Sequence, residues 1–273
     1  MPELPEVETV RRTLEPALLG KKIMEAEVFC CSYLRGCNDE TLGRLLPRSR
    51  FRRLARHGKY LYLILDSLEL EVHLGMTGRL LVCARDQELV KHTHVRFGLE
   101  EGQDLRFIDP RRFGHLGIKP LGMARERRSL LGMEPLTPEF TWKNLGRALK
   151  GRKAPIKALL LEQKLVAGLG NIYADEALFR ARIHPEQTGG ELGESALKNL
   201  HRAINDLIGE AVAAGGTSFS DYVDATGQRG EFFERLSVYG RENQPCPYCG
   251  TPIKRLKLRG RSTCYCPRCQ PQS

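Results

Sequence analysis

The residues best suited to covalent chemistry stand at the start of the chain, where Pro2 follows Met1 and Glu3 follows Pro2. Removal of Met1 would make Pro2 a free secondary amine. The reference pKa of an α-amino group is about 7.7 to 8.0, so an appreciable fraction is unprotonated at neutral pH. Such an amine can add to an aldehyde-type carbon to give a cationic iminium, and the adjacent Glu3 carboxyl can move protons. The first three residues therefore suit nucleophilic catalysis.

The same stretch also fits a plain capped helix. Pro5 suits the first turn of a helix, and the acids Glu6 and Glu8 favour its positive end. The apolar residues that follow have helical spacing: Val7, Val10, Leu14 and Leu18. Pro16 should bend or end such a helix, and Gly20 can close it. On chemistry alone, a capped helix and a catalytic terminus both stay open.

Length and charge narrow the class of protein. At 273 residues the chain can form two domains, and 41% hydrophobic with 28% charged residues is typical of globular proteins. A formal net charge of +10 favours a polyanionic partner such as nucleic acid, although a merely basic soluble protein would carry the same charge. No apolar run approaches the length of a membrane span, and the start lacks a secretory signal pattern. We therefore expect a cytosolic protein with no membrane contact.

The carboxyl-terminal tail carries two Cys-x-x-Cys pairs with sixteen residues between them: Cys246, Cys249, Cys266 and Cys269. This spacing predicts a zinc ribbon, and four thiolates close the coordination shell, so we expect one structural Zn²⁺ per chain. The hairpin between the pairs is rich in cations suited to phosphate oxygens: Lys254, Arg255, Lys257, Arg259 and Arg261. A solvated basic hairpin is the alternative interpretation.

The other cysteines lack paired ligand spacing. We interpret Cys30, Cys31, Cys37 and Cys83 as packing or surface thiols, which is typical of a reducing compartment. Cys264 lies just outside the second pair and is interpreted as a bystander.

The secondary-structure pattern of the sequence changes near residue 131. Short segments rich in β-forming residues predict an antiparallel sandwich or barrel behind one leading helix: 23–31, 51–66, 68–74, 79–84, 94–99, 105–108 and 113–120. A proline-rich stretch near residue 131 reads as a linker. Helical periods follow, including a helix from Ser195 to Ala214. We interpret the glycine-rich stretch from Gly215 to Tyr239 as a substrate lid in preference to a passive linker.

Several motifs occur together and in one order along nearly the whole chain: 2–8 (PELPEVE), 57–61 (HGKYL), 73–76 (HLGM), 109–114 (DPRRFG), 168–176 (GLGNIYADE) and the cysteine pairs. The ordered set resembles the formamidopyrimidine-DNA glycosylase family, bacterial enzymes that excise oxidised purines such as 8-oxoguanine and then nick the strand.

The resemblance implies an α+β protein of two domains with DNA bound in the cleft between them. The expected boundaries are 1–130 for a catalytic β-sandwich domain with a leading helix, 131–143 for the linker, 144–240 for a helix-two-turn-helix domain with the lid, and 241–273 for the zinc-ribbon hairpin. The implied partner is damaged double-stranded DNA, bound by a monomer in the bacterial cytosol near the nucleoid.

The resemblance also implies roles for single residues. Pro2 would attack C1′ of the sugar, Glu3 would be its acid/base partner, and Lys59 would contact phosphate and assist. The implied DNA-binding residues are His92, Lys157, Asn171, Tyr239 and Arg261. Met76, Arg111 and Phe113 would fill the gap left by an extruded base, although Met76 and Phe113 alone would read as ordinary core. The iminium then permits β- and δ-elimination without a redox or nucleotide cofactor.

Two rival functions stay open. The endonuclease VIII branch of the same superfamily favours oxidised pyrimidines, and Leu4 together with the three gap-filling residues points away from it. A catalytically inert DNA-binding protein becomes credible if Met1 is retained, because the nitrogen of Pro2 would then be an amide. The chain departs from the commonest family pattern at three positions: Ser262 for glycine, Cys264 for histidine and Glu162 for aspartate.

Overall fold

The computed structural model describes residues 1–273 except 37, 123–128, 219–222 and 273. Contacts divide the chain into two compact units: Met1–Leu130 with Ala214–Phe233, and Leu131–Ala213 with Glu234–Ser273. The predicted α+β class is confirmed, with β-sheets in the amino-terminal unit and helices with a four-cysteine cluster in the other. Residues 214–233, which the sequence groups with the helical region, make their contacts in the amino-terminal unit. The central part of the predicted lid, 219–222, and Cys37 lie outside the described residues.

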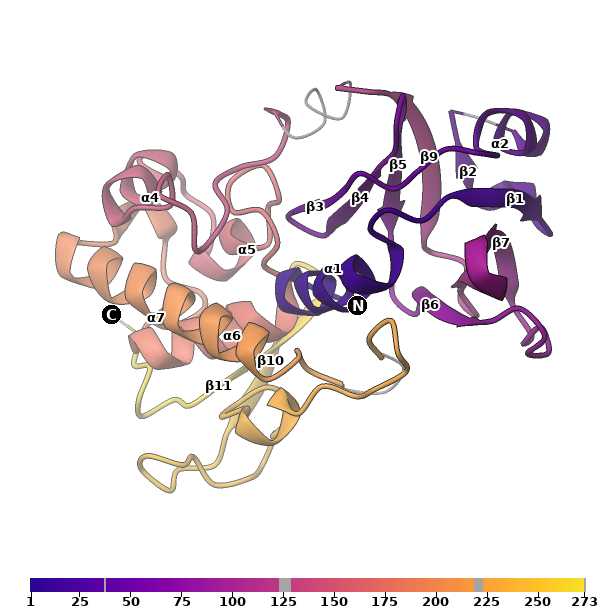
Figure 1. Cartoon of the computed structure of the whole chain (residues 1–273). Helices are drawn as coiled ribbons and strands as arrows, with labels where there is room; N and C mark the ends of the chain where they lie inside the picture. The colour runs from indigo at the N-terminus through magenta and orange to yellow at the C-terminus, as the bar shows by residue number, and fades with distance from the viewer. Residues whose placement is uncertain (37, 123–128, 219–222, 273) are drawn as a thin grey trace. The chain divides into compact units, whose positions relative to one another are not determined.

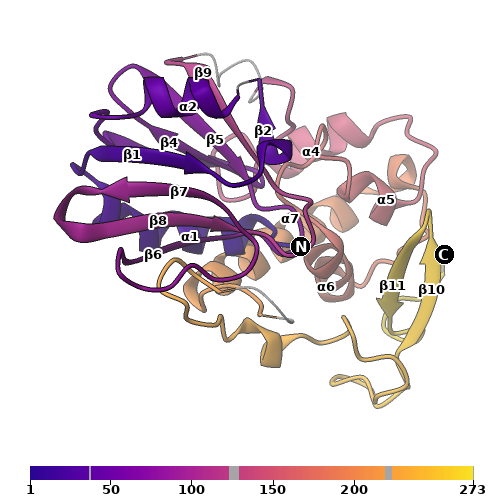
Figure 2. The same cartoon turned by 90° about the vertical axis from the view of Figure 1, so that its right-hand side faces the viewer.

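Two sheets form the body of the amino-terminal unit (Figure 2). One is antiparallel, in the order β1 (Ile23–Val28), β7 (Thr93–Leu99), β8 (Gln103–Ile108) and β6 (Arg79–Ala84). The other has the order β2 (Leu34–Arg35), β9 (His115–Pro120), β5 (Leu68–His73), β4 (Tyr60–Ile64) and β3 (Arg53–His57). In that sheet β2 pairs with β9 in parallel, whereas the other pairs among its described strands are antiparallel. The segment predicted as one strand over 51–66 is a hairpin, because Gly58 adopts a positive φ of 56° at its turn.

The leading helix α1 (Leu4–Leu18) forms as predicted and continues through Pro16 for two residues. Its apolar stripe joins the main core with residues of both sheets: Val7, Val10, Leu14 and Leu18. The short helix α2 (Asp39–Leu45) was not expected from the sequence. It begins where the Asn38 side chain accepts a hydrogen bond from the Thr41 amide. Short 3₁₀ turns lie at Cys31–Tyr33, Glu100–Gly102, Gly189–Glu191 and Phe232–Arg235.

The carboxyl-terminal unit contains the helices α4 (Trp142–Leu149), α5 (Ile156–Leu160), α6 (Asn171–Ala181) and α7 (Glu194–Ala213) (Figure 1). Gln163 organises the turn between α5 and α6, since its side chain bonds the backbone of Leu161, Gly168 and Leu169. The stretch predicted as a linker is bonded to this turn: the Met133 amide donates to the Leu165 carbonyl at 3.1 Å. The hairpin of β10 (Lys254–Leu258) and β11 (Arg261–Tyr265) completes the unit.

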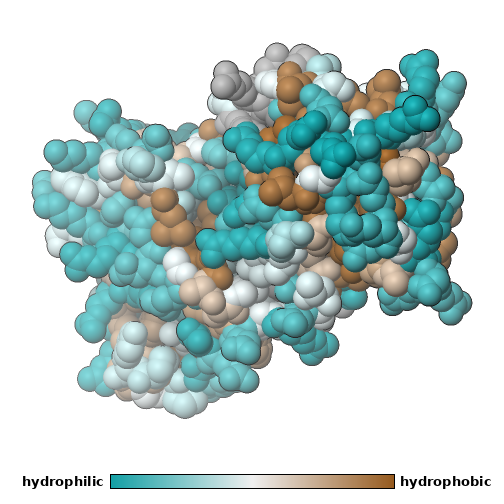
Figure 3. All heavy atoms as spheres, viewed as in Figure 1, coloured by the Kyte–Doolittle hydropathy of each residue, from teal (hydrophilic) through white to brown (hydrophobic). Residues whose placement is uncertain are grey.

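The surface seen in Figure 3 is mostly hydrophilic, as the high content of charged residues leads one to expect. Among the described residues, no helix combines the length and the apolar character that crossing a membrane requires.

Candidate functional site

The start of α1 is both a helix cap and the position of the candidate nucleophile. Glu3 and Glu6 form a capping box, in which the Glu3 amide donates to Glu6 Oε2 at 2.7 Å. Pro2 is buried and Glu3 exposes only 2% of its surface, whereas Met1 exposes 47%. The two interpretations of this segment are therefore compatible, because the capping residue Glu3 directly follows the candidate nucleophile.

Glu6 has a second partner in the segment that follows α7. Its Oε1 accepts the amide of Thr217 at 2.7 Å, and both residues are buried. A Cβ on Gly216 would lie 2.9 Å from the same oxygen. One carboxylate thus fixes the backbone of Glu3 and the first residues of the predicted lid.

Lys59 lies at the turn between β3 and β4 and exposes 6% of its surface. Arg56 attaches this turn to α1: its Nε donates to Glu8 Oε2 at 3.1 Å, and its Nη1 donates to the Gly58 carbonyl at 3.0 Å. Burial alone would raise the pKa of Glu8, but hydrogen bonds from Arg11 and Arg12 and the charge of Arg56 lower it to about 2. The carboxylate is therefore ionised and holds the Lys59 turn against the helix that carries Pro2.

Two loops of the amino-terminal unit interlock around the buried carboxylate of Asp109. Thr77 Oγ1 donates to its Oδ1 at 2.5 Å, and the Gly114 amide donates to its Oδ2 at 2.7 Å. Gly75 has a φ of 59°, and a Cβ there would lie 2.4 Å from the Gly114 nitrogen. Such a close approach requires glycine at residue 75. Loops 74–78 and 109–114 therefore act as one rigid element.

This element brings together the three residues predicted to fill a gap in DNA. Met76 and Phe113 expose 38% and 55% of their surfaces, so neither is an ordinary core residue. The Arg111 guanidinium lies 5.3 Å from the centre of the Phe113 ring, a cation–π contact.

His92 lies beside the same element, since its carbonyl accepts the Asp109 amide at 3.1 Å. His94 and Tyr33 stack with ring centres 3.9 Å apart, and both bond the Asp109 carbonyl. Burial lowers the pKa of His94, which favours its neutral form. Arg112 is exposed with a φ of 62°. Apart from His92, the sequence analysis did not single out these residues, although Asp109 and Arg112 lie inside a quoted motif.

The four predicted zinc ligands converge in the carboxyl-terminal unit. Their sulfur atoms all lie within 4.8 Å of one another, with Cys246 and Cys269 3.8 Å apart and Cys249 and Cys266 3.5 Å apart. Tetrahedral zinc with Zn–S bonds of about 2.3 Å requires sulfur separations of about 3.8 Å. The site therefore fits one structural zinc ion, and its chemistry is to hold the two knuckles of the ribbon together.

The departures from the family pattern are accommodated without strain. Ser262 lies in regular β11 opposite Lys257, and the positive φ values of the hairpin fall at Arg259 and Gly260 instead. Cys264 is buried and outside the set of four thiols. Glu162 accepts a 2.6 Å hydrogen bond from Arg152.

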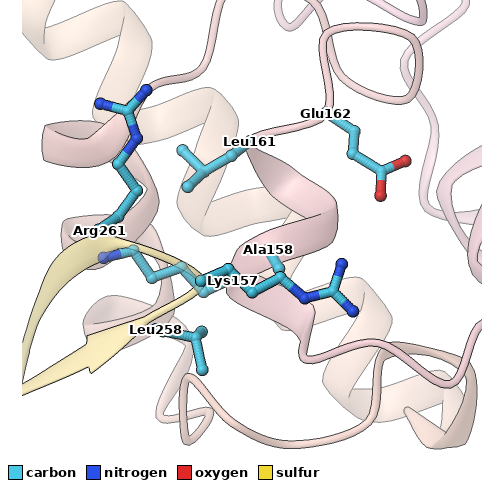
Figure 4. A pocket seen from close by; sticks show the side chains of 7 residues that line it. Lys157, Ala158, Leu161, Glu162, Leu258 and Arg261 are labelled. Carbon is cyan, nitrogen blue, oxygen red and sulfur yellow. The ribbon is translucent and has the colours of Figure 1, made fainter.

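A pocket between α5 and the hairpin is lined by Lys157, Ala158, Leu161, Glu162, Leu258, Arg259 and Arg261 (Figure 4). Arg261 is exposed, and its guanidinium points away from the hairpin, as a phosphate contact requires. Lys157 instead exposes 0% and reaches across to β11. Asn171 is partly buried and donates to the Ser262 carbonyl at 3.0 Å.

The predicted residue Tyr239 is held by its backbone. Its amide, like those of Ser237 and Val238, donates to the buried carboxylate of Glu176. Burial raises the pKa of Glu176, while these three amides oppose the rise. The segment that enters the zinc ribbon is thereby attached to α6.

The fold and the four-cysteine site define a helix-two-turn-helix protein with a zinc ribbon. The model of the formamidopyrimidine-DNA glycosylase N-terminal domain matches residues 1–116, that of the H2TH domain of the same enzymes 131–223, and that of a zinc finger found in FPG and IleRS 243–272. The chain belongs to the formamidopyrimidine-DNA glycosylase family. It is therefore a DNA repair enzyme with glycosylase and abasic-site lyase activity.

Individual relatives cover the whole chain. The formamidopyrimidine-DNA glycosylase of Desulforamulus reducens is 45% identical over 99% of both chains. A mutant of Lactococcus lactis FPG bound to a Fapy-dG containing DNA is 36% identical, with a TM-score of 0.93 over 99% of this chain and 100% of the other. The MutM (FPG) protein of Thermus thermophilus is 42% identical, with a TM-score of 0.88 over 100% of both chains.

Proposed function

We propose that this glycosylase excises oxidised purines, namely 8-oxoguanine and formamidopyrimidines, from duplex DNA, and that Pro2 is its nucleophile. The observation that carries the proposal is the capped start of α1, where the buried Pro2 adjoins a Glu3 whose backbone is fixed by Glu6. The Lactococcus lactis relative bound to Fapy-dG DNA supports the class of lesion.

The reaction follows from the amine of Pro2 once Met1 is removed. Its lone pair attacks C1′, the bond from C1′ to the base breaks, and Glu3 supplies a proton as acid catalyst. Loss of the amine proton and opening of the sugar ring give an iminium, whose positive charge acidifies the C2′ proton. Removal of that proton breaks the bond from C3′ to the 3′ phosphate oxygen. A second elimination expels the 5′ phosphate, and water then releases the sugar fragment from Pro2.

The remaining residues suit the steps before chemistry. Extrusion of a base costs a few kcal/mol, and side chains that occupy the hole offset part of this cost. Met76, Arg111 and Phe113 are exposed on one rigid element that could fill the hole. We assign Lys59, His92 and Arg261 to contacts with DNA phosphates. We assign Tyr239 and Asn171 to contacts with the DNA around the lesion.

Borohydride trapping tests the nucleophile. The enzyme without Met1 should give a stable covalent adduct with DNA that contains 8-oxoguanine, because hydride reduces the iminium. A variant that retains Met1 should give none, since an amide nitrogen lacks the reactive lone pair. Pro2→Gly should give less adduct than the parent enzyme. Undiminished trapping in both variants would remove Pro2 from the mechanism.

Lesion preference is a separate experiment. We expect faster excision of 8-oxoguanine opposite cytosine than of thymine glycol opposite adenine. A clear preference for thymine glycol would favour the endonuclease VIII type of substrate. This control matters because a wild-type Lactococcus lactis FPG, 36% identical, has been solved with an oxidised pyrimidine containing DNA.

We also propose that the enzyme acts as a monomer, because one chain carries every residue assigned above. Light scattering coupled to gel filtration, with and without a duplex, tests this. A stoichiometric complex of one chain per lesion supports the proposal, and a dimer on the DNA contradicts it.

A further inference from the structure

The ammonium of Lys157 is enclosed by three partners in the carboxyl-terminal unit. Its Nζ lies 2.7 Å from Asp175 Oδ1 and donates to the Ser262 carbonyl and to Thr263 Oγ1, each also at 2.7 Å. The side chain exposes 0% of its surface. Of the three N–H donors of a lysine ammonium, two are used by β11, and the Asp175 carboxylate lies against the ammonium as an ion pair. A DNA phosphate could bind Lys157 only by displacing the hairpin strand.

Two of the partners of Lys157, Ser262 and Thr263, belong to β11, the strand that begins with the exposed Arg261. Asp175 extends the contact along β11, because its Oδ2 accepts the Cys264 amide at 2.9 Å. Asn171 donates to the Ser262 carbonyl that Lys157 also binds. Three consecutive residues that follow Arg261 are therefore held by side chains from α5 and α6.

We propose that Lys157 and Asp175 are positioning residues, which hold β11 so that Arg261 faces DNA phosphate, and that Lys157 does not itself contact the nucleic acid. The inference rests on the proposed DNA-binding role of the hairpin. It divides the work in the ribbon: zinc holds the knuckles together, and the buried pair sets the position of the strand. Figure 4 shows both directions, with Lys157 reaching to the hairpin and Arg261 pointing away from it.

A paired substitution separates the two roles of Lys157. Burial raises the pKa of Asp175 to about 7 even beside Lys157, so Lys157→Met leaves a buried carboxyl that must take up a proton and has lost its ion pair, which is unfavourable, whereas a neutral pair of similar volume is tolerated. We expect Lys157→Met to weaken binding to a duplex with an abasic-site analogue by about tenfold, and Lys157→Met/Asp175→Asn to recover to within about threefold of the parent. A phosphate ligand would show no such rescue, because Asp175→Asn adds no cation.

The salt dependence of binding gives a second readout. Each phosphate contact contributes about 0.9 to the slope of log K against log salt. The zinc-loaded double variant should keep the slope of the parent, and Arg261→Met should lower the slope by about 0.9 both in the parent and in the double variant. A slope lowered by about 0.9 in the double variant, with a full zinc content, overturns the proposal.

Two controls keep the outcomes distinct. If Lys157→Met does not fold, the double variant is compared directly with the parent, and the slope still decides. Amide exchange at Ser262–Cys264 in the DNA-free enzyme should speed up in Thr263→Val, which removes one partner of Lys157 and keeps its ion pair with Asp175. Unchanged exchange there contradicts the positioning role. Failure of the parent enzyme itself to bind duplex DNA would instead defeat the proposed function.

Discussion

The two units hold their candidate functional groups by contacts of different range. At the start of α1, Glu3 and Glu6 are three positions apart, and at the Lys59 turn Arg56 binds a carbonyl two positions away. In the zinc ribbon, Lys157 binds Thr263 across 106 positions. The start of α1 and the Lys59 turn are thus held in part by neighbours in sequence, whereas the hairpin is held by distant helices and by its zinc site.

This difference indicates how each region should respond to damage. A local cap survives changes elsewhere in the chain, whereas a hairpin assembled from distant parts fails when any one of them is lost. Long-range contacts also occur in the amino-terminal unit, because Arg56 binds Glu8, 48 positions away, and Glu6 binds Thr217, 211 positions away. Loss of zinc, of Asp109, of Glu6 and of the Glu8 charge should therefore affect the two units unequally.

Removal of zinc should have the largest effect. Cys249→Ser or a strong chelator should unfold the ribbon and weaken DNA binding by more than about tenfold, because structural zinc contributes about 10–16 kcal/mol of apparent folding free energy in small domains. Amide exchange in α1 and the two sheets should stay as in the parent. Cys83→Ser is the matched control, and it should keep both zinc and affinity. Equal affinity in Cys249→Ser would contradict the role given to the hairpin.

Loss of the Asp109 carboxylate comes next. Asp109→Asn should destabilise the amino-terminal unit by about 2–3 kcal/mol, because the amide cannot accept from both Thr77 and Gly114. Base extrusion, followed by the fluorescence of 2-aminopurine beside the lesion, should slow more than DNA binding weakens. Thr77→Val removes the hydrogen bond to Asp109 and should lower the free energy of unfolding by about 1 kcal/mol. An extrusion rate unchanged in Asp109→Asn would show that the interlocked loops do not serve this step.

Glu6→Gln should lower the free energy of unfolding by about 1–2 kcal/mol, since one amide group replaces a carboxylate that accepts hydrogen bonds from the amides of both Glu3 and Thr217. The rate of base excision in a single turnover should fall while abasic-site binding is retained. Thr9→Val, which removes a hydroxyl bonded only to its own helix, is the control. Loss of activity in proportion to stability alone in both variants would argue against a linking role for Glu6.

The smallest of the four predicted effects is a loss of stability at low pH, which also acts through helix α1. The pKa of Glu8 is about 2 in the folded protein against a reference of 4.5, so its contribution is present above about pH 4.5 and is lost as the pH falls toward 2. Glu8→Gln should remove about 1 kcal/mol at pH 7, after allowance for solvent screening, and should flatten this acid limb. Melting temperatures between pH 3 and pH 7 measure it. A parallel pH dependence in parent and variant would contradict the assignment.

The sequence predicted the elements whose signals are local. The leading helix, the helix over 195–214 and the cysteine spacing each depend on residues a few positions apart, and all three are found. The sequence did not predict two kinds of feature. The hairpin turn at Gly58 divides an apolar run that alternation alone cannot divide. The contacts of Asp109 and Asp175 join segments far apart in the chain, which a linear pattern does not encode.

Lys157 illustrates the second limit most directly. The family resemblance identified it as a DNA-binding residue, but a lysine in a basic protein gives no sign of whether it faces solvent or the interior. Its complete burial follows from Asp175 and β11, which pack around it only after folding. A role inferred from likeness thus located the residue, and the structure was needed to determine what its ammonium binds.

Peptide mapping of the reduced enzyme–DNA conjugate tests the central claim most directly. Trapped on 8-oxoguanine DNA and digested, the enzyme should yield a single modified peptide whose mass places the deoxyribose fragment on the nitrogen of Pro2. A fragment located on Lys59 or another side chain, or the absence of any conjugate from enzyme that lacks Met1, would contradict it.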